Sequence, residues 1–165
     1  LQLSGALGEA WGWSFGYAWV DATLTDDFIS PIGTFIQEEG ARLPGVPEHT
    51  FNGALEYRNP IGGDRTVLAR LAGYYQSETR NAISTSPLFD VDLDSFQIWD
   101  ASVSLLANSW SASLWIKNIA NEEGVTGVFT EAYMGTAPDE GYYGNGSKEL
   151  ISLPRTIGVS VGYSF

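Results

Sequence analysis

The chain has 165 residues, of which 13% are aromatic and only 17% are charged, and its formal net charge is −12. Disorder requires low hydrophobicity, a membrane-spanning helix requires about 18 apolar residues in a row, and nucleic-acid binding requires clustered Lys and Arg, so these classes are excluded. The absence of cysteine excludes a disulfide framework and cysteine-ligated metal sites.

The first two predicted strands are joined by a tight turn at residues 8–10. They cover residues 1 to about 7 and residues 11 to about 25. Five aromatic residues of the second strand alternate with small residues and therefore share one face: Trp11, Trp13, Phe15, Tyr17 and Trp19. At about 15 residues, this strand is longer than the roughly 9–11 residues that cross a membrane, so we expect it to project beyond one interface.

Short turns and long loops alternate along the rest of the chain. We predict strands at about 49–58, 65–77, 96–107 and 110–118, and a last strand at 155–165. Residues 59–64 and 108–109 form short turns. Long loops are expected at about 26–48, 78–95 and 119–152, and fifteen of the twenty carboxylates fall within them.

The last strand shows most clearly which kind of sheet these strands build. Its large apolar residues are odd-numbered (Ile157, Val159, Val161, Tyr163, Phe165), and its even-numbered residues are small or polar. The small face cannot fill a core, whereas a membrane barrel turns its apolar face to lipid and keeps a polar interior. Short turns at one end and long loops at the other are also typical of outer-membrane barrels.

The predicted fold class is therefore all-β, an antiparallel up-and-down meander of about seven strands. Bacterial single-chain barrels have an even number of strands, and an open sheet would leave unpaired edges in lipid. We therefore interpret residues 1–165 as the C-terminal portion of a larger transmembrane β-barrel domain whose earlier strands are absent from this sequence.

Three passages of the chain carry a family resemblance. Residues 42–51 (RLPGVPEHTF), 113–123 (SLWIKNIANEE) and 153–165 (LPRTIGVSVGYSF) resemble, in the same order, segments of the late barrel strands of TonB-dependent outer-membrane receptors. Each passage is short, but the ordered set is specific. Glu48 is the one departure, since the family often has a basic residue there.

The resemblance implies a 22-stranded barrel, plugged by an N-terminal domain, in the bacterial outer membrane. Such receptors import scarce nutrients, most commonly ferric siderophores, with energy passed through the TonB complex. Cobalamin, haem and oligosaccharides remain open as ligands. The plug domain is absent from this sequence, no cofactor is expected, and the implied partners are the lipid bilayer, the plug, the TonB complex and a small-molecule or metal-chelate ligand.

Two groups of residues are candidate sites. A planar chelate or a sugar suits an aromatic-rich loop, so the residues proposed to contact ligand are those of the longest loop: Phe129, Tyr133, Tyr142, Tyr143 and Asn145. Val161, Tyr163 and Phe165 resemble the C-terminal signal that the barrel-assembly machinery recognises. The alternatives are a loop packed on its own aromatic residues and a terminal residue that merely anchors at the interface.

Other residues have structural interpretations. The tryptophans of the second strand spread along its length, which favours lipid contact over a sugar-binding platform. Asp90, Asp92 and Asp94 imitate the start of a calcium loop, but Ser95 replaces the required glycine and Ala101 the bidentate glutamate, so an EF-hand is not expected. A solvated acidic loop is the default interpretation, and a loose divalent-ion site at the rim stays open. His49 lacks recognisable catalytic partners, and Arg70 and Lys117 are expected to point inward.

Three competing functions remain. A porin-like channel would share the terminal aromatic residue and the alternation, but would lack an upstream plug. A soluble carbohydrate-binding β-sandwich would bring the apolar faces of two sheets together in a core. An enzyme is not expected, because no G-x-S-x-G or H-E-x-x-H motif is present.

Overall fold

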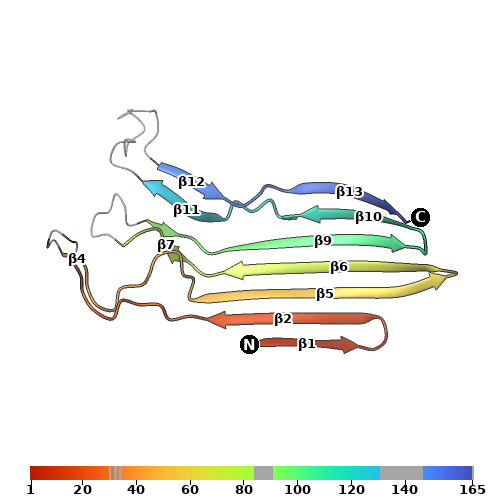
Figure 1. Ribbon diagram of the computed structural model, residues 1–165, viewed down its shortest axis with the longest axis horizontal. Helices are drawn as coiled ribbons and strands as arrows, with labels where there is room; N and C mark the ends of the chain where they lie inside the picture. Colours follow the sequence, from red (N-terminus) through yellow and green to blue (C-terminus); the bar gives the residue numbers. More distant parts are fainter. Residues whose placement is uncertain (30, 32, 34, 84–90, 131–146, 165) are drawn as a thin grey trace.

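The chain forms a single antiparallel sheet of seven strands in the order β1-β2-β5-β6-β9-β10-β13 (Figure 1). The computed structural model describes residues 1–165 except 30, 32, 34, 84–90, 131–146 and 165. Within the described part, no helix is long and apolar enough to cross a membrane. The strands of the sheet are β1 (Gln2–Leu7), β2 (Trp11–Trp19), β5 (His49–Gly62), β6 (Arg65–Gln76), β9 (Phe96–Leu106), β10 (Trp110–Lys117) and β13 (Thr156–Tyr163).

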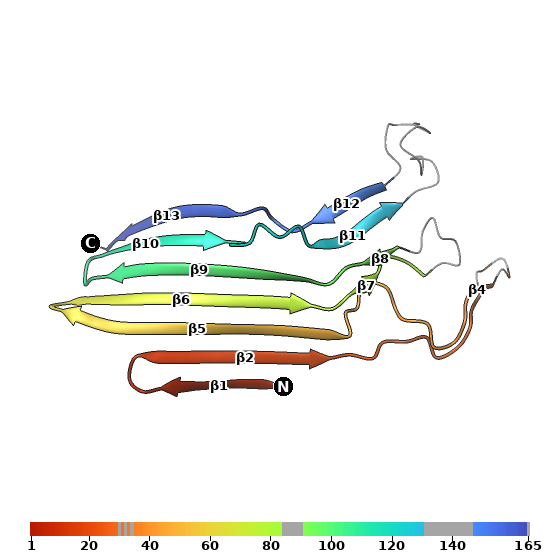
Figure 2. The same cartoon turned by 180° about the vertical axis from the view of Figure 1, so that it is seen from behind.

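The three long segments predicted as loops contain short hairpins instead, and this part of the prediction was wrong. Their strands are β3 (Phe28–Ile29) with β4 (Phe35–Gln37), β7 (Thr79–Arg80) with β8 (Asp92–Leu93), and β11 (Val125–Thr130) with β12 (Ser147–Ile151). Most are too short to show alternation in the sequence. All three hairpins lie at the end of the sheet opposite the tight turns (Figures 1 and 2).

The strand registers confirm the predicted division into two faces. One continuous row of paired residues crosses six strands on the apolar face: Trp13, Leu55, Leu71, Ala101, Ile116 and Ile157. The neighbouring row, on the opposite face, consists of Gly12, Glu56, Arg70, Ser102, Trp115 and Gly158. A shift of one residue at any pair would mix these two sets.

No second layer covers the apolar face within the described residues. Leu114 is 58% exposed and Val161 is 76% exposed. The buried hydrophobic residues of the described part are Leu93 and Phe96, on β8 and at the start of β9. A β-sandwich would bury the apolar faces of two sheets against each other. All seven long strands form one sheet instead, so the soluble sandwich hypothesis was wrong.

Strand β2 ends at Trp19, earlier than the predicted Thr25. The last backbone bond of this pairing runs from the Val20 N–H to the Glu48 carbonyl, at 2.9 Å. Residues 44–47, which include two prolines, then interrupt the ladder. Backbone bonds resume only beyond them, from the Leu43 N–H to the Ala22 carbonyl and from the Leu24 N–H to the Ala41 carbonyl, both at 2.8 Å. The regular strand is therefore shorter than expected, although the Thr23–Arg42 bridge continues the pairing beyond it. The strands that exceed the length of a membrane crossing are β5, with 14 residues, and β6, with 12.

The turn between β5 and β6 is shorter than predicted. Residues 59–64 were expected to form it, but β5 continues through Pro60 to Gly62. The register shifts between Pro60 and Gly62. Ile61 is the bulged residue, whereas Pro60 itself pairs with Thr66. Proline is tolerated there because even-numbered residues of β5 donate toward β2, whose pairing starts only at Trp11 opposite Tyr57, so position 60 lies at an edge. The connection itself is made by Gly63, at a φ of 58°, and Asp64.

The paired rows run obliquely to the ends of the sheet. Trp11 begins β2 after one tight turn, and its row passes through Tyr57, Ala69 and Val103 to Leu114. Trp110, the equivalent first residue of β10, lies four residues before Leu114. At about 3.4 Å per residue and 4.8 Å per strand, this stagger over four strand spacings corresponds to a tilt of roughly 35°. Barrel strands tilt by about 35–45° relative to the membrane normal.

We predict that charge is tolerated on one face of β9 and not on the other. Val103 lies mid-strand on the apolar face and is 54% exposed, whereas its neighbour Ser102 lies on the polar face. In the complete protein in bilayers, Val103→Arg should lower the free energy of unfolding by about 2–4 kcal/mol, because arginine near the hydrocarbon midplane is costly. The measurement is urea-induced unfolding. Ser102→Arg is the matched control and should cost clearly less; equal losses would contradict the assignment of the faces.

Candidate functional site

A charged cluster lies on the polar face near the middle of the sheet. Arg70 of β6 forms an ion pair with Glu56 of β5, and their side chains are 48% and 46% exposed. Arg70 also lines a hollow of about 280 Å³ together with Asp100 and Lys117. Arg70 and Lys117 therefore lie on the same, polar face of the sheet, and their inward direction stays a prediction. Because the ion pair is exposed, it contributes little to stability, and its charges remain accessible to a group that faces this surface.

Trp115 gives the polar face an aromatic surface that the sequence did not identify. Its indole Nε1 donates a hydrogen bond to Ser160 Oγ at 3.1 Å. The ring lies over Gly158 on the adjacent strand, where a Cβ atom would come within 2.1 Å of Trp115 Cζ2. The small residue at position 158 is therefore required by the tryptophan across from it, a relationship visible only once the register is known.

Asn118 fastens the loop-side end of the sheet. It is only 3% exposed, and its side-chain Nδ2 donates to the carbonyls of Glu122 and Leu153, both at 2.8 Å. Its Oδ1 accepts the Glu122 N–H at 2.8 Å, and its own N–H donates to Asp100 Oδ1 at 2.9 Å. One side chain thus joins the end of β10, the start of the next loop and the segment before β13.

The backbone at Asn118 and Asn121 explains why asparagine occupies both positions. Asn118 has a φ of 51° and Asn121 a φ of 57°, a left-handed conformation that asparagine tolerates better than most residues. Asn121 Oδ1 accepts the Arg155 N–H at 2.9 Å. Both asparagines therefore tie residues 118–122 to the segment that precedes β13.

An acidic hollow of about 340 Å³ lies between β8 and β11 at the loop end. Its lining includes five carboxylate residues: Asp92, Asp94, Glu122, Glu123 and Glu149. Arg80 Nε lies 3.4 Å from Asp92 Oδ1. In the part of the chain that the structure describes, no group of three or more His, Cys, Asp and Glu side chains could hold a metal ion. Asp90, the first residue of the calcium-like pattern, lies outside the described residues.

The residues predicted to contact ligand are only partly described. Phe129 lies on β11, opposite Lys148 of β12, and is 53% exposed. Its strand is held to the neighbouring loop by a hydrogen bond of 2.7 Å from the Val128 N–H to Asn81 Oδ1. Tyr133, Tyr142, Tyr143 and Asn145 lie outside the described residues. The structure therefore places one member of the set, at the end of the sheet where the long loops gather (Figure 1).

Two of the three residues predicted as the assembly signal lie on β13. Val161 pairs with Ala112 and Tyr163 with Trp110, and Tyr163 is 65% exposed. Phe165 lies outside the described residues. Val161 and Tyr163 belong to the apolar face, as the alternation predicted.

His49 has a structural environment at the start of β5. Its Nδ1 lies 3.0 Å from the Tyr17 hydroxyl, and its ring stacks on Tyr17 with 6.1 Å between the centroids. The neighbouring Trp19 donates from Nε1 to Glu48 Oε1 at 3.2 Å. These polar contacts at the loop end of an aromatic face are typical of the membrane–water interface. The arrangement agrees with the interpretation of the β2 aromatic residues as lipid-facing.

We predict that Asn118 is the most sensitive polar position at the loop end. Asn118→Ala should lower the free energy of unfolding by about 3 kcal/mol or more, because it strands buried backbone groups and places alanine in a left-handed conformation. Asn118→Gly should cost about 1 kcal/mol less, since glycine adopts this conformation freely. Urea unfolding of the complete protein measures both. Equal losses of unfolding free energy in the two variants would show that the backbone conformation is unimportant. Losses below about 1 kcal/mol would contradict the role of Asn118 in holding the loop-side end of the sheet together.

Comparison with known proteins identifies the kind of barrel. The family model described as TonB dependent receptor-like, beta-barrel matches residues 1–119. The crystal structure of the siderophore receptor PiuA from Acinetobacter baumannii is similar, with a TM-score of 0.68 and 17% identity, over 98% of this chain and 20% of that chain. The ferric-catecholate import receptor Fiu from E. coli K12, in its closed form, gives a TM-score of 0.66 and 18% identity, over 99% and 20%. This chain spans about a fifth of the length of these receptors, and no curated protein matches it.

Proposed function

The chain belongs to the family of TonB-dependent receptor β-barrels, and we propose that it is the C-terminal part of a receptor that imports a ferric siderophore with energy from TonB. Members of this family are bacterial outer-membrane proteins, so the outward face of the sheet contacts lipid. In the proposal, residues 1–165 belong to a barrel of 22 strands, and a plug domain fills its lumen. The transported ligand is a scarce nutrient, with the iron chelate as the first candidate.

The observation that carries this proposal is that one face of the sheet is apolar and the other carries polar and charged side chains. The apolar face has no covering layer among the described residues, and its side chains align in continuous rows across the sheet. The other face carries the Glu56–Arg70 ion pair and the hollow with Asp100 and Lys117. A barrel wall with lipid outside and a polar lumen inside requires this division. The exposed luminal charges are suited to face the polar surface of a plug.

The proposed ligand class is supported by the two similar solved structures and by the residues at the loop end of the sheet. One similar structure is a siderophore receptor and the other a ferric-catecholate import receptor. Phe129 offers exposed aromatic surface at the loop end, where a planar chelate has access. The five carboxylates around the nearby hollow repel an anionic chelate. Contact with this part of the rim would therefore come through aromatic side chains, including the proposed Tyr133, Tyr142 and Tyr143, with Asn145 as a proposed polar contact.

A transport experiment separates the receptor from a porin-like channel. The complete protein is expressed in an iron-limited strain without its own siderophore receptors, with or without TonB. We expect uptake of at least one radiolabelled ferric siderophore, among catecholate and hydroxamate probes, that is lost when TonB is removed. Haem, cobalamin and an oligosaccharide are tested in parallel. Uptake that does not depend on TonB, together with a permanently open conductance in planar bilayers, would instead indicate a channel.

The contribution of the rim is tested at Phe129. Phe129→Ala should weaken binding of the transported chelate to the complete receptor by about tenfold, because an aromatic contact contributes about 0.5–1.5 kcal/mol beyond its buried area. The measurement is equilibrium binding to outer-membrane preparations. Leu150→Ala is the matched control, since Leu150 lies on the same hairpin and is 49% exposed. Equal effects of the two changes would contradict a specific ligand contact.

The proposed assembly signal predicts a defect in biogenesis without a defect in stability. Phe165→Ser should reduce the amount of folded receptor in the outer membrane severalfold, whereas Ser164→Ala should leave it unchanged. Heat-modifiable migration in gels measures the folded fraction. Both proteins are also refolded in detergent, where we expect the same urea midpoint as for the unmodified receptor. A lower midpoint for Phe165→Ser would show that the residue acts as an interface anchor rather than as a recognition signal.

A further inference from the structure

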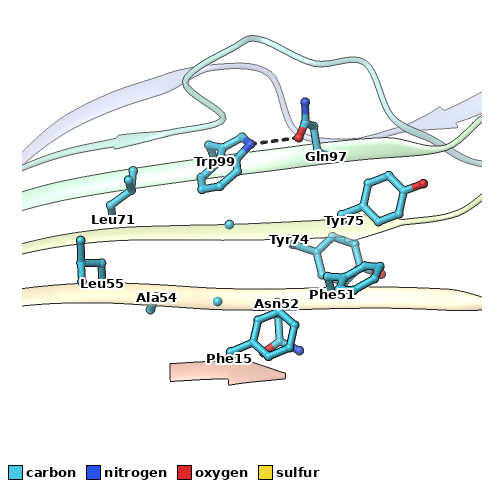
Figure 3. A pocket seen from close by; sticks show the side chains of 12 residues that line it. Phe15, Phe51, Asn52, Ala54, Leu55, Leu71, Tyr74, Tyr75, Gln97 and Trp99 are labelled. Atoms are coloured by element: carbon cyan, nitrogen blue, oxygen red, sulfur yellow. Dashed lines mark hydrogen bonds between the residues drawn. The ribbon is translucent and has the colours of Figure 1, made fainter. Parts of the chain in front are cut away.

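A hollow of about 280 Å³ lies on the outward face, in the middle of the sheet (Figure 3). It forms because Gly53 of β5 and Gly73 of β6 are paired directly across from each other. Phe15 lies beside Gly53 in the same row, and Trp99 lies beside Gly73. Four further outward side chains border the glycine pair along the strands: Phe51, Leu55, Leu71 and Tyr75.

The two glycines differ in what covers them. A Cβ atom at Gly73 would come within 2.7 Å of the Trp99 ring, so that ring already lies over Gly73. A Cβ atom at Gly53 would meet only the Ser14 backbone carbonyl, at 3.4 Å. The floor of the hollow is therefore the bare backbone at Gly53. Trp99 forms one side, and its Nε1 donates to Gln97 Oε1 at 3.3 Å.

Neighbouring aromatic rings hold the opposite side in place. Phe51 contacts Phe15, with 6.2 Å between centroids, and Tyr75, with 5.8 Å. It also contacts Tyr17, with 4.8 Å between centroids. Rings at these separations pack in tilted geometry and restrict one another. The hollow is thus bounded by ordered side chains and does not depend on a single mobile group.

The uncharged lining of the hollow favours a hydrocarbon as its occupant. None of its twelve lining residues is charged. For comparison, an apolar cavity of about 150 Å³ stays dry and binds benzene or xenon. The hollow is continuous with the lipid-facing surface of the family's barrels. Gly53 is the fifth of the 14 residues of β5 and Gly73 the ninth of the 12 residues of β6, so the hollow lies nearer the long loops than the tight turns. An occupant therefore enters from the half of the bilayer nearest those loops.

We propose that this hollow is a binding site for one acyl chain of a lipid in the extracellular leaflet. On β13 the outward side chains project instead, as at Val159 and Val161, which are 70% and 76% exposed. A chain lying on such a ridge touches protein on one side only. A chain in the hollow contacts the backbone floor and the bordering side chains, and therefore resides longer. The inference depends on the outward placement of this face and is independent of which ligand is transported.

Photochemical labelling of the complete receptor tests the site. The protein is reconstituted in phosphatidylcholine bilayers with increasing amounts of a phosphatidylcholine that carries a diazirine in the middle of one chain. After illumination, labelled residues are mapped by mass spectrometry. We expect labelling around Phe51, Leu55 and Trp99 to be at least fivefold higher than around Val159 and Val161, and to saturate. Labelling that is uniform over the outward face, or that rises in proportion to the probe without saturating, would overturn the proposal.

A variant that fills the hollow gives the matched comparison. Gly53→Leu places a side chain where the structure leaves open space, and should reduce the labelling to the level of Val159. Val103→Leu adds one methylene to an outward side chain away from the hollow and should leave the labelling unchanged. If Gly53→Leu fails to assemble, the proposal is tested by whether labelling of the unmodified receptor saturates as the amount of probe is increased. Crosslinks from these residues to a second receptor copy, in place of lipid, would also overturn the proposal.

Discussion

The structure depends on one constraint: the sheet has a continuous apolar face and, on its other side, residues too small and too polar to form a core. The row of paired residues from Trp13 to Ile157 is apolar across six strands, and the row from Gly12 to Gly158 on the other side is small or polar except at Trp115. Water is an unfavourable solvent for such an extended apolar surface. Lipid removes that cost without a second protein layer, and the inter-strand ladder satisfies the backbone polar groups that lipid cannot.

This constraint divides the chain into regions with different chemistry. The tight turns lie at one end, the lipid-facing band occupies the middle, and short hairpins extend from the other end. Side-chain hydrogen bonds to backbone fix the hairpin end where the sheet pairing stops, through Asn118, Asn121 and Asn81. The charged cluster around Arg70 lies on the polar face near the middle of the sheet, whereas the exposed aromatic surface of Phe129 lies at the hairpin end, so the proposed contacts to a plug and to a ligand fall at different levels.

The sequence predicted the strands and their faces well because a period of two is a local property. It failed where the outcome depends on the partner strand. Strand β2 ends where residues 44–47 of the partner segment interrupt the ladder, and Pro60 fits within β5 because the pairing with β2 has already ended beside it. The hollow also depends on the register, since Gly53 and Gly73 meet only in the folded sheet. Asn118 lies within residues 113–123, which resemble a family motif. Its buried hydrogen bond to the Leu153 carbonyl could not be predicted, because it joins residues distant in sequence.

The most direct test of the central claim measures the environment of successive residues on one strand. Nitroxide labels are attached at cysteines introduced one at a time at positions 101–105 of β9, in a cysteine-free form of the complete receptor in bilayers. Electron paramagnetic resonance then gives the collision rates with oxygen, which is enriched in hydrocarbon, and with a polar nickel chelate. The account predicts that oxygen accessibility alternates with a period of two, high at Ala101, Val103 and Leu105 and low at Ser102 and Ser104. Equal oxygen accessibility at all five positions, or the reverse alternation, would contradict it.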